Sequence, residues 1–187
     1  ITNPINLCLN DGTLNPAGVG WSRHPLHRAN LRGRWLSKKR WNYWAVTTET
    51  HFFAISISNR DYFGAIALQL GDFTTQKIVG KYALTPMGRG VKMPETVEGK
   101  VIFEQKGLKA IQDHQGNNVS ITVEADDIGG VPLNANFELT YPKNHQTLSV
   151  VVPWNRRTFQ YTSKHNTIPA KGTVHLGDQC IYFAGEQ

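Results

Sequence analysis

The stretch Asn42–Leu70, NYWAVTTETHFFAISISNRDYFGAIALQL, carries the pattern that indicates the fold. Its runs are rich in β-branched and aromatic residues and are separated by turn residues such as Asn59-Arg60-Asp61, which is typical of strands. Within the run HFFAISIS, Phe53, Ile55 and Ile57 alternate with Ala and Ser. A period of two residues indicates a strand with one buried face. The stretch therefore predicts strands in succession rather than helices.

The same pattern continues from this stretch to the end of the chain. In NNVSITVEA, for example, Val119, Ile121 and Val123 alternate with polar residues. We count roughly ten to twelve such runs, spaced about 8–12 residues apart, which favours an antiparallel barrel or sandwich. One or two helical turns are conceivable between Arg28 and Lys39, although Gly33 weakens them. The prediction is an all-β, antiparallel barrel of about 8–10 strands.

The length of 187 residues suits a single domain, 1–187, in which residues 1–40 form an irregular lead-in that packs on the barrel. The chain starts at Ile1 and stops just after a strand-like run, so we expect a piece of a longer protein that lacks a C-terminal half. No apolar run approaches the ~20 residues of a membrane helix. Cys8 and Cys180 form no disulfide framework, which favours a reducing, cytoplasmic location.

Positive charge and tryptophan are concentrated in Trp21–Trp44, WSRHPLHRANLRGRWLSKKRWNYW. This basic stretch holds four of the five tryptophans and seven of the 20 Lys and Arg, so the rest of the chain has 13 of them against 14 Asp and Glu. Three interpretations are open. The tryptophans plug one end of a barrel, or the stretch lines an anion or ligand site, or it binds nucleic acid. Nucleic acid is the least favoured, because the remainder of the chain is close to neutral.

Two further motifs carry polar residues in patterns of interest. In Pro153–Gly172, strand alternation places Gln160 and Lys164 on one face, which is solvent-exposed in most strands and becomes functional if it faces a pocket. In Thr85–Gly99, Glu95 and Glu98 are expected to be acid partners of the basic stretch. A phosphate loop, a nucleophile elbow and a metal-ligand spacing are all absent from the sequence, so we predict no cofactor and no metal.

Three segments resemble a known family: LNPAGVGWSRHPLHRANLRGRWLSKKRWNYW, GRGVKMPETVEG and PWNRRTFQYTSKHNTIPAKGTV. They are similar to the domain-of-unknown-function 2804 family, whose members look about twice as long as this chain and continue into a second, tryptophan-rich half. The resemblance implies a lipocalin-like (calycin) barrel as the first of two, with the ligand inside it or between the halves. The architecture of the family is similar to that of tandem lipocalin-like proteins, which include enzymes that hydrate or cyclise polyenes. The resemblance implies no particular ligand.

The first functional hypothesis is binding of a hydrophobic or amphipathic small molecule that carries an anionic group. Its predicted ligand-binding residues are Arg23, Trp41, Trp44, Trp154, Arg157, Gln160 and Lys164. The alternative is an enzyme of hydratase, isomerase or cyclase type on a hydrophobic substrate, with Lys164, His165 and Glu95 as candidate catalytic residues. The second alternative is nucleic-acid binding through residues 23–40.

Overall fold

The computed structural model describes residues 1–32 and 35–184, and in these residues all regular structure is strand apart from one short 3-10 helix. The helix η1 spans Pro16–Gly18. The strands are β1 (Ile5–Asn6), β2 (Gly20–Ser22), β3 (His27–Arg28), β4 (Arg40–Thr47), β5 (His51–Asn59), β6 (Phe63–Asp72), β7 (Lys77–Pro86), β8 (Val91–Lys92), β9 (Gly99–Gln105), β10 (Leu108–Gln115), β11 (Asn118–Ile128), β12 (Val131–Thr140), β13 (Leu148–Asn155), β14 (Thr158–Lys164), β15 (Ala170–Leu176) and β16 (Gln179–Ala184). The predicted all-β, antiparallel fold class is confirmed.

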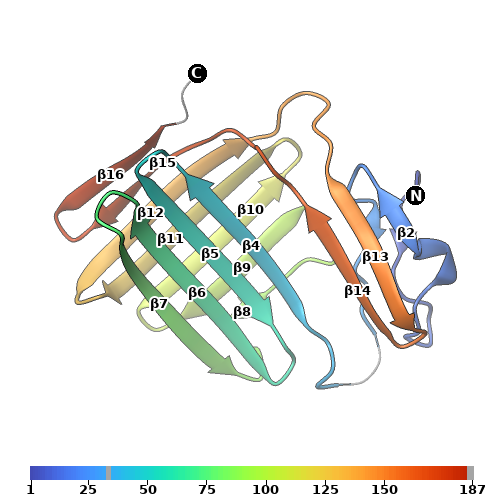
Figure 1. The fold of residues 1–187 in the computed structure, drawn as a ribbon. Helices are drawn as coiled ribbons and strands as arrows, with labels where there is room; N and C mark the ends of the chain where they lie inside the picture. The colour runs from blue at the N-terminus through green and yellow to red at the C-terminus, as the bar shows by residue number, and fades with distance from the viewer. Residues whose placement is uncertain (33–34, 185–187) are drawn as a thin grey trace.

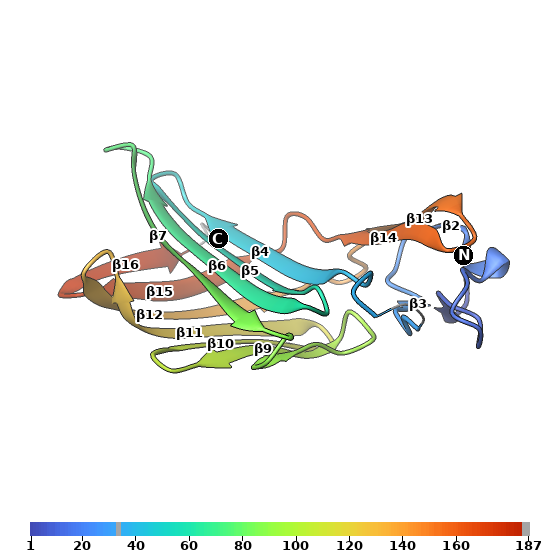
Figure 2. The same ribbon diagram turned by 90° about the horizontal axis from the view of Figure 1, so that it is seen from below.

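Two antiparallel sheets face each other across the main core (Figures 1 and 2). One has four strands in the order β4-β5-β6-β7, and the other has seven in the order β16-β15-β12-β11-β10-β9-β8. Phe53 of the four-stranded sheet stacks on Phe137 of the seven-stranded sheet with ring centroids 5.1 Å apart, and Phe183 meets Phe137 edge-on at the same distance. These three rings, each at most 2% exposed, join the two layers.

The predicted inward positions are confirmed in both sheets, although Ala54 and Ser58 on the opposite face of β5 are buried as well. In β5, Phe53, Ile55 and Ile57 are 0–1% exposed and point into the core. In β11, every second residue from Val119 to Ala125 is buried and the residues between them are exposed. Since neighbouring side chains of a strand point to opposite faces, this pattern decides which face of each sheet meets the other.

The hairpin of β13 and β14 is not part of the seven-stranded sheet. In that sheet β12 pairs directly with β15, the next strand after the hairpin. Its strands form a separate sheet with the N-terminal segment, in the order β14-β13-β2 (Figure 1). A second, smaller core of Leu7, Leu14 and Val151 lies there, with Phe159 and Tyr161 packed against it. The N-terminal lead-in thus packs against this hairpin.

The helical turns that were conceivable between Arg28 and Lys39 do not form in the described part of that segment. Trp35 and Leu36 lie in a turn instead, and Leu36 has a φ of 75°, which is left-handed rather than right-handed helical geometry. Both Cys8 and Cys180 are free thiols. Among the described residues, no helix has the length and apolar character needed to span a membrane.

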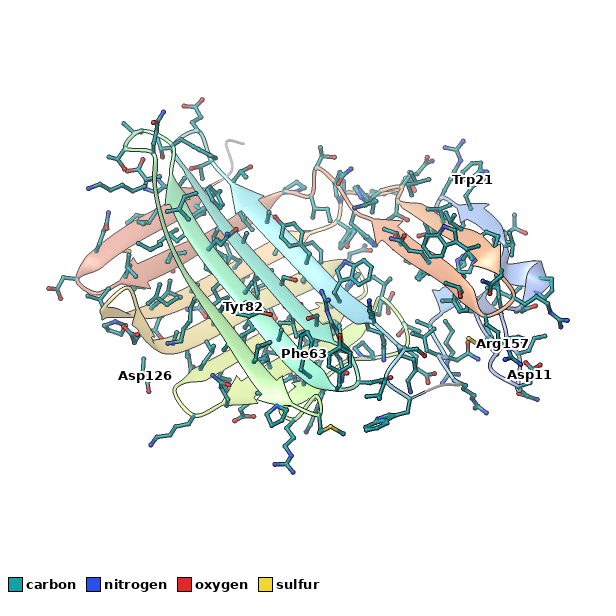
Figure 3. The ribbon with its side chains drawn as sticks, turned by 60° about the horizontal axis from the view of Figure 1, so that its bottom comes forward. Asp11, Trp21, Phe63, Tyr82, Asp126 and Arg157 are labelled. Atoms are coloured by element: carbon teal, nitrogen blue, oxygen red, sulfur yellow. The ribbon has the colours of Figure 1, made fainter. Side chains whose placement is uncertain are left out.

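The outer face of the four-stranded sheet has no charged side chain on any of its 18 outward positions, counted from the strand registers. Ala and Ser occupy most outward positions of its two central strands, whereas the edge strands expose large apolar residues such as Tyr43 and Tyr82. Tyr82 is labelled in Figure 3. Exposed apolar patches of this kind are typical of surfaces that contact another molecule.

Candidate ligand-binding site

A cleft of about 1430 Å³ lies between two sheet edges. Its sides are β4, the edge of the four-stranded sheet, and β14, the edge of the sheet that the hairpin forms with β2. All residues of β4 and all residues of β14 line it. Ligand pockets usually measure about 300–1,000 Å³, so the cleft is large enough for a long or bulky molecule.

The walls of the cleft are aromatic and its floor is apolar. Trp41, Trp44 and Trp154 all line it, and Trp44 packs against the main core while the other two are more than half exposed. The floor consists of core residues that the cleft reaches: Val46, Val101, Val119 and Leu139. Because these side chains come from both facing sheets, the cleft opens directly onto the core.

Positive charge dominates the cleft, which six Lys and Arg line against two acids, Asp11 and Glu95. Two of the cations are engaged: Lys38 lies 3.7 Å from the Asp61 carboxylate, and Arg40 donates to the carbonyl oxygens of Met93 and Pro94. The other four form no ion pair with a described residue, and they are Arg32, Lys39, Arg157 and Lys164. The cleft is therefore an electropositive surface next to an apolar floor.

Glu95 forms its contacts with residues of the basic stretch. Its Oε2 accepts a hydrogen bond from Arg28 Nε at 2.6 Å, and its carbonyl accepts another from the Ala29 amide at 2.6 Å. The expectation that Glu95 pairs with the basic stretch is thus confirmed. As a candidate catalytic residue it lines the cleft, but its carboxylate is held by Arg28.

Arg23 is the one predicted site residue that does not line the cleft. Its guanidinium lies 5.6 Å from the ring centroid of Trp21 and donates to Gln146 Oε1 at 2.6 Å. The reason is the strand order β14-β13-β2, which puts the end of β2 on the far side of β13 from the cleft. Arg23 is therefore not part of the site that we describe, and the other predicted residues are brought together without it.

The strand β14 has the predicted two-sided character. Phe159, Tyr161 and Ser163 form its packed side, whereas Gln160 and Lys164 are exposed. Gln160 Nε2 donates to Thr162 Oγ1 at 3.1 Å. Because β14 is an edge strand, both of its faces border the cleft, so Gln160 and Lys164 reach it from the solvent side and not from a buried interior.

His165 is the most constrained polar group of the cleft. Its Nδ1 lies 2.7 Å from the Tyr141 hydroxyl, and its Nε2 lies 2.8 Å from Ser163 Oγ, which in turn lies 2.7 Å from Ser149 Oγ. A neutral imidazole satisfies both contacts by donating from one nitrogen and accepting at the other. Burial lowers the pKa of His165 to about 4, and the nearby His114 adds to the effect. The ring is thus neutral near pH 7.

Tyr141 is the centre of a small aromatic cluster that ends this hydrogen-bond chain. His114 stacks on it in parallel at 5.1 Å, and His145 and His165 meet it edge-on at 5.2 and 5.7 Å. Burial raises the pKa of Tyr141, so the phenol keeps its proton. The cluster ties β10 and the end of β12 to the end of β14 beside the cleft.

Sequence reasoning did not find the residues that complete the site: Gln112, His114, Tyr141, Ser149 and Ser163. They come from four different strands or strand ends and share no spacing, so no local motif marks them. The one available signal was polarity on an otherwise apolar strand face, since Gln112 and His114 occupy inward positions of β10. No group of three or more metal-ligating side chains is clustered within residues 1–32 and 35–184.

Fold and cleft together define an antiparallel β-protein of facing sheets with an open, electropositive cleft at their edge. The family model described as a domain of unknown function (DUF2804) matches residues 1–187, so the chain belongs to this family, as its motifs indicated. No curated protein and no solved structure matches the chain.

Proposed function

We propose that this protein binds a hydrophobic or amphipathic small molecule with an anionic group in the cleft between β4 and β14. The observation that carries the proposal is one cleft that combines an apolar floor, tryptophan walls and four cations, none of which forms an ion pair with a described residue. Arg and Trp together suit such a ligand, because the ring faces contact its apolar body and the guanidinium meets its charge. Arg157 and Lys164 are the proposed partners of the anionic end.

Dodecanoate, followed by tryptophan fluorescence or calorimetry, is a suitable first probe, with hexadecanoate and retinoate as longer ones. We expect saturable binding that weakens about tenfold in the double variant Arg157→Gln/Lys164→Gln, since two charged contacts are lost. Methyl dodecanoate, which has no charge, is expected to bind both proteins alike. The matched control Arg89→Gln/Lys106→Gln removes the same charge away from the cleft.

Two outcomes contradict this proposal. One is the absence of saturable binding for all three acids. The other is equal weakening by the cleft variant and the control, which would assign the effect to net charge rather than to contacts in the cleft.

We further propose a lipocalin-like (calycin) relationship, a second half of the protein as a partner, and a cytoplasmic location. The lipocalin-like (calycin) assignment, and a second half of the protein as a partner that borders the cleft, rest on the family resemblance alone. A cytoplasmic location rests on the two free cysteines, since reduced thiols are usual in reducing compartments.

An enzyme of hydratase or isomerase type is the second candidate function, and the position of His165 favours it. A neutral imidazole that lines an apolar cleft and is linked to Tyr141 and Ser163 can accept or return a proton during addition of water to a double bond. The test is incubation with an unsaturated acid, (9Z)-hexadecenoate, in heavy water, read by mass spectrometry. Hydration or deuterium uptake that is lost in His165→Gln is expected, and an unchanged substrate mass contradicts this function.

A further inference from the structure

Gln112 of β10 is a buried amide without a protein partner. Its side chain is 2% exposed, and neither Oε1 nor Nε2 forms a hydrogen bond with any described residue. The other inward positions of β10 and of its neighbour β11 are apolar up to His114, namely Leu108, Ala110, Val119, Ile121, Val123 and Ala125. The Nε2 donor and the Oε1 acceptor of Gln112 are thus surrounded by apolar side chains and form no hydrogen bond with a described residue.

A buried polar group without a partner destabilises the fold, so native structures nearly always provide one. Gln112 lines the cleft, together with the core residues Val101 and Val119 that pair with β10 on either side. The cleft is therefore the direction from which a partner for this amide reaches it.

His114 lies two residues further along β10, on the same face, and also lines the cleft. Its Nε2 donates to the Gly116 carbonyl oxygen at 3.0 Å, so this nitrogen carries a proton. Its Nδ1 is buried and unpartnered, and in the neutral ring it is an acceptor. The floor of the cleft thus offers an amide donor, an amide acceptor and an imidazole acceptor.

We propose that Gln112 and His114 bind a hydroxyl group at the apolar end of the ligand. A hydroxyl accepts from Gln112 Nε2 and donates to His114 Nδ1, whereas a ketone or ester carbonyl only accepts. A carboxylate at the floor would bring a charge into an apolar surface, which is costly without a cation beside it. The inference rests on the proposed function, because the rest of the ligand is the anionic, apolar molecule described there.

The experiment compares dodecanoate with 12-hydroxydodecanoate, which adds one hydroxyl at the end remote from the carboxylate. Wild-type protein is expected to bind the hydroxy acid about five- to tenfold more tightly, the effect of one or two buried hydrogen bonds. In Gln112→Met, which keeps the shape but loses the amide, the ratio of the two affinities is expected to fall to about one. Gln69→Met, on the exposed outer face, is the matched control and keeps the preference.

The possible results distinguish a failure of the proposed hydroxyl site from a failure of the proposed ligand binding. If both acids bind wild-type protein equally, the inference is overturned and the proposed function stands. A preference that persists in Gln112→Met also overturns it. If neither acid binds, the proposed function fails and the inference falls with it.

A second measurement tests the premise without any ligand. Because the amide has no protein partner, Gln112→Met is expected to unfold in urea at the wild-type midpoint or above it. A clear fall of that midpoint would mean that the amide makes a protein hydrogen bond, and it would overturn the inference.

Discussion

Replacing Phe137 with alanine is expected to lower the free energy of unfolding by about 3–5 kcal/mol. The ring is 2% exposed and touches Phe53 of the facing sheet and Phe183 of β16, both at centroid distances of 5.1 Å. Its removal leaves a cavity where three rings from two layers meet, and a close-packed sheet interior relaxes only partly to fill it. Since domains of this kind are stable by about 5–15 kcal/mol, much of the stability is lost.

Urea unfolding followed by circular dichroism measures this change, with Tyr82→Ala as the control. Tyr82 lies on the outer face of the four-stranded sheet (Figure 3). Its side chain is 63% exposed, so its truncation is expected to change the free energy of unfolding by less than about 0.5 kcal/mol. A loss below about 1 kcal/mol for Phe137→Ala would show that the two sheets do not depend on this contact.

Acid is expected to destabilise the protein through His165. Burial holds the pKa of this imidazole at about 4 in the folded protein, below its ordinary value near 6.5 in the unfolded chain. Between these two values the unfolded chain binds a proton that the folded protein does not, so stability falls as the pH drops from about 6.5 towards 4. Above about pH 6.5 both forms are neutral and the effect vanishes. The charged and titratable groups that face the ring are Tyr141, His114 and His145.

The measurement compares the free energy of unfolding at pH 7.5 and pH 4.5 for wild-type protein and His165→Gln. The wild type is expected to lose about 2 kcal/mol more than the variant over this range, a figure reduced for the partial exposure of the ring. Asp11 and Asp72 have lowered pKa values because of hydrogen bonds from threonine, and they also weaken the fold in acid. They are present in both proteins, so they cancel in the comparison. Equal losses in the two proteins would contradict the assignment to His165.

Local sequence patterns were sufficient for the fold class and for the faces of the strands. The alternation around Phe53 in β5 and around Ile121 in β11 correctly predicted which residues point into the core, because neighbouring side chains of a strand point to opposite faces. In β5 the small residues Ala54 and Ser58 of the opposite face are buried as well. The same reasoning placed Gln160 and Lys164 on one face of β14, where the structure has them.

Patterns of residue type also predicted several residues that line the cleft. Trp41, Trp44, Trp154 and Arg157 border it, as do Gln160, Lys164, His165 and Glu95. All of them except Glu95 belong to two short motifs rich in aromatic and basic residues, and β4 and β14, which carry half of the eight, lie on opposite sides of the cleft. What these residues bind stays a prediction.

The amino-acid sequence by itself determined that the chain forms short antiparallel strands, which side of each strand is buried, and which residues are chemically suited to a ligand. Only the tertiary structure decided that the β13–β14 hairpin leaves the main sheet, that Arg23 lies beyond β13, and that Gln112, His114 and His165 meet at one cleft. The physical reason is the distance along the chain over which the deciding interactions act. Strand periodicity follows from the geometry of adjacent residues, whereas the neighbours of a strand depend on contacts between residues far apart in the chain, and no local pattern encodes these.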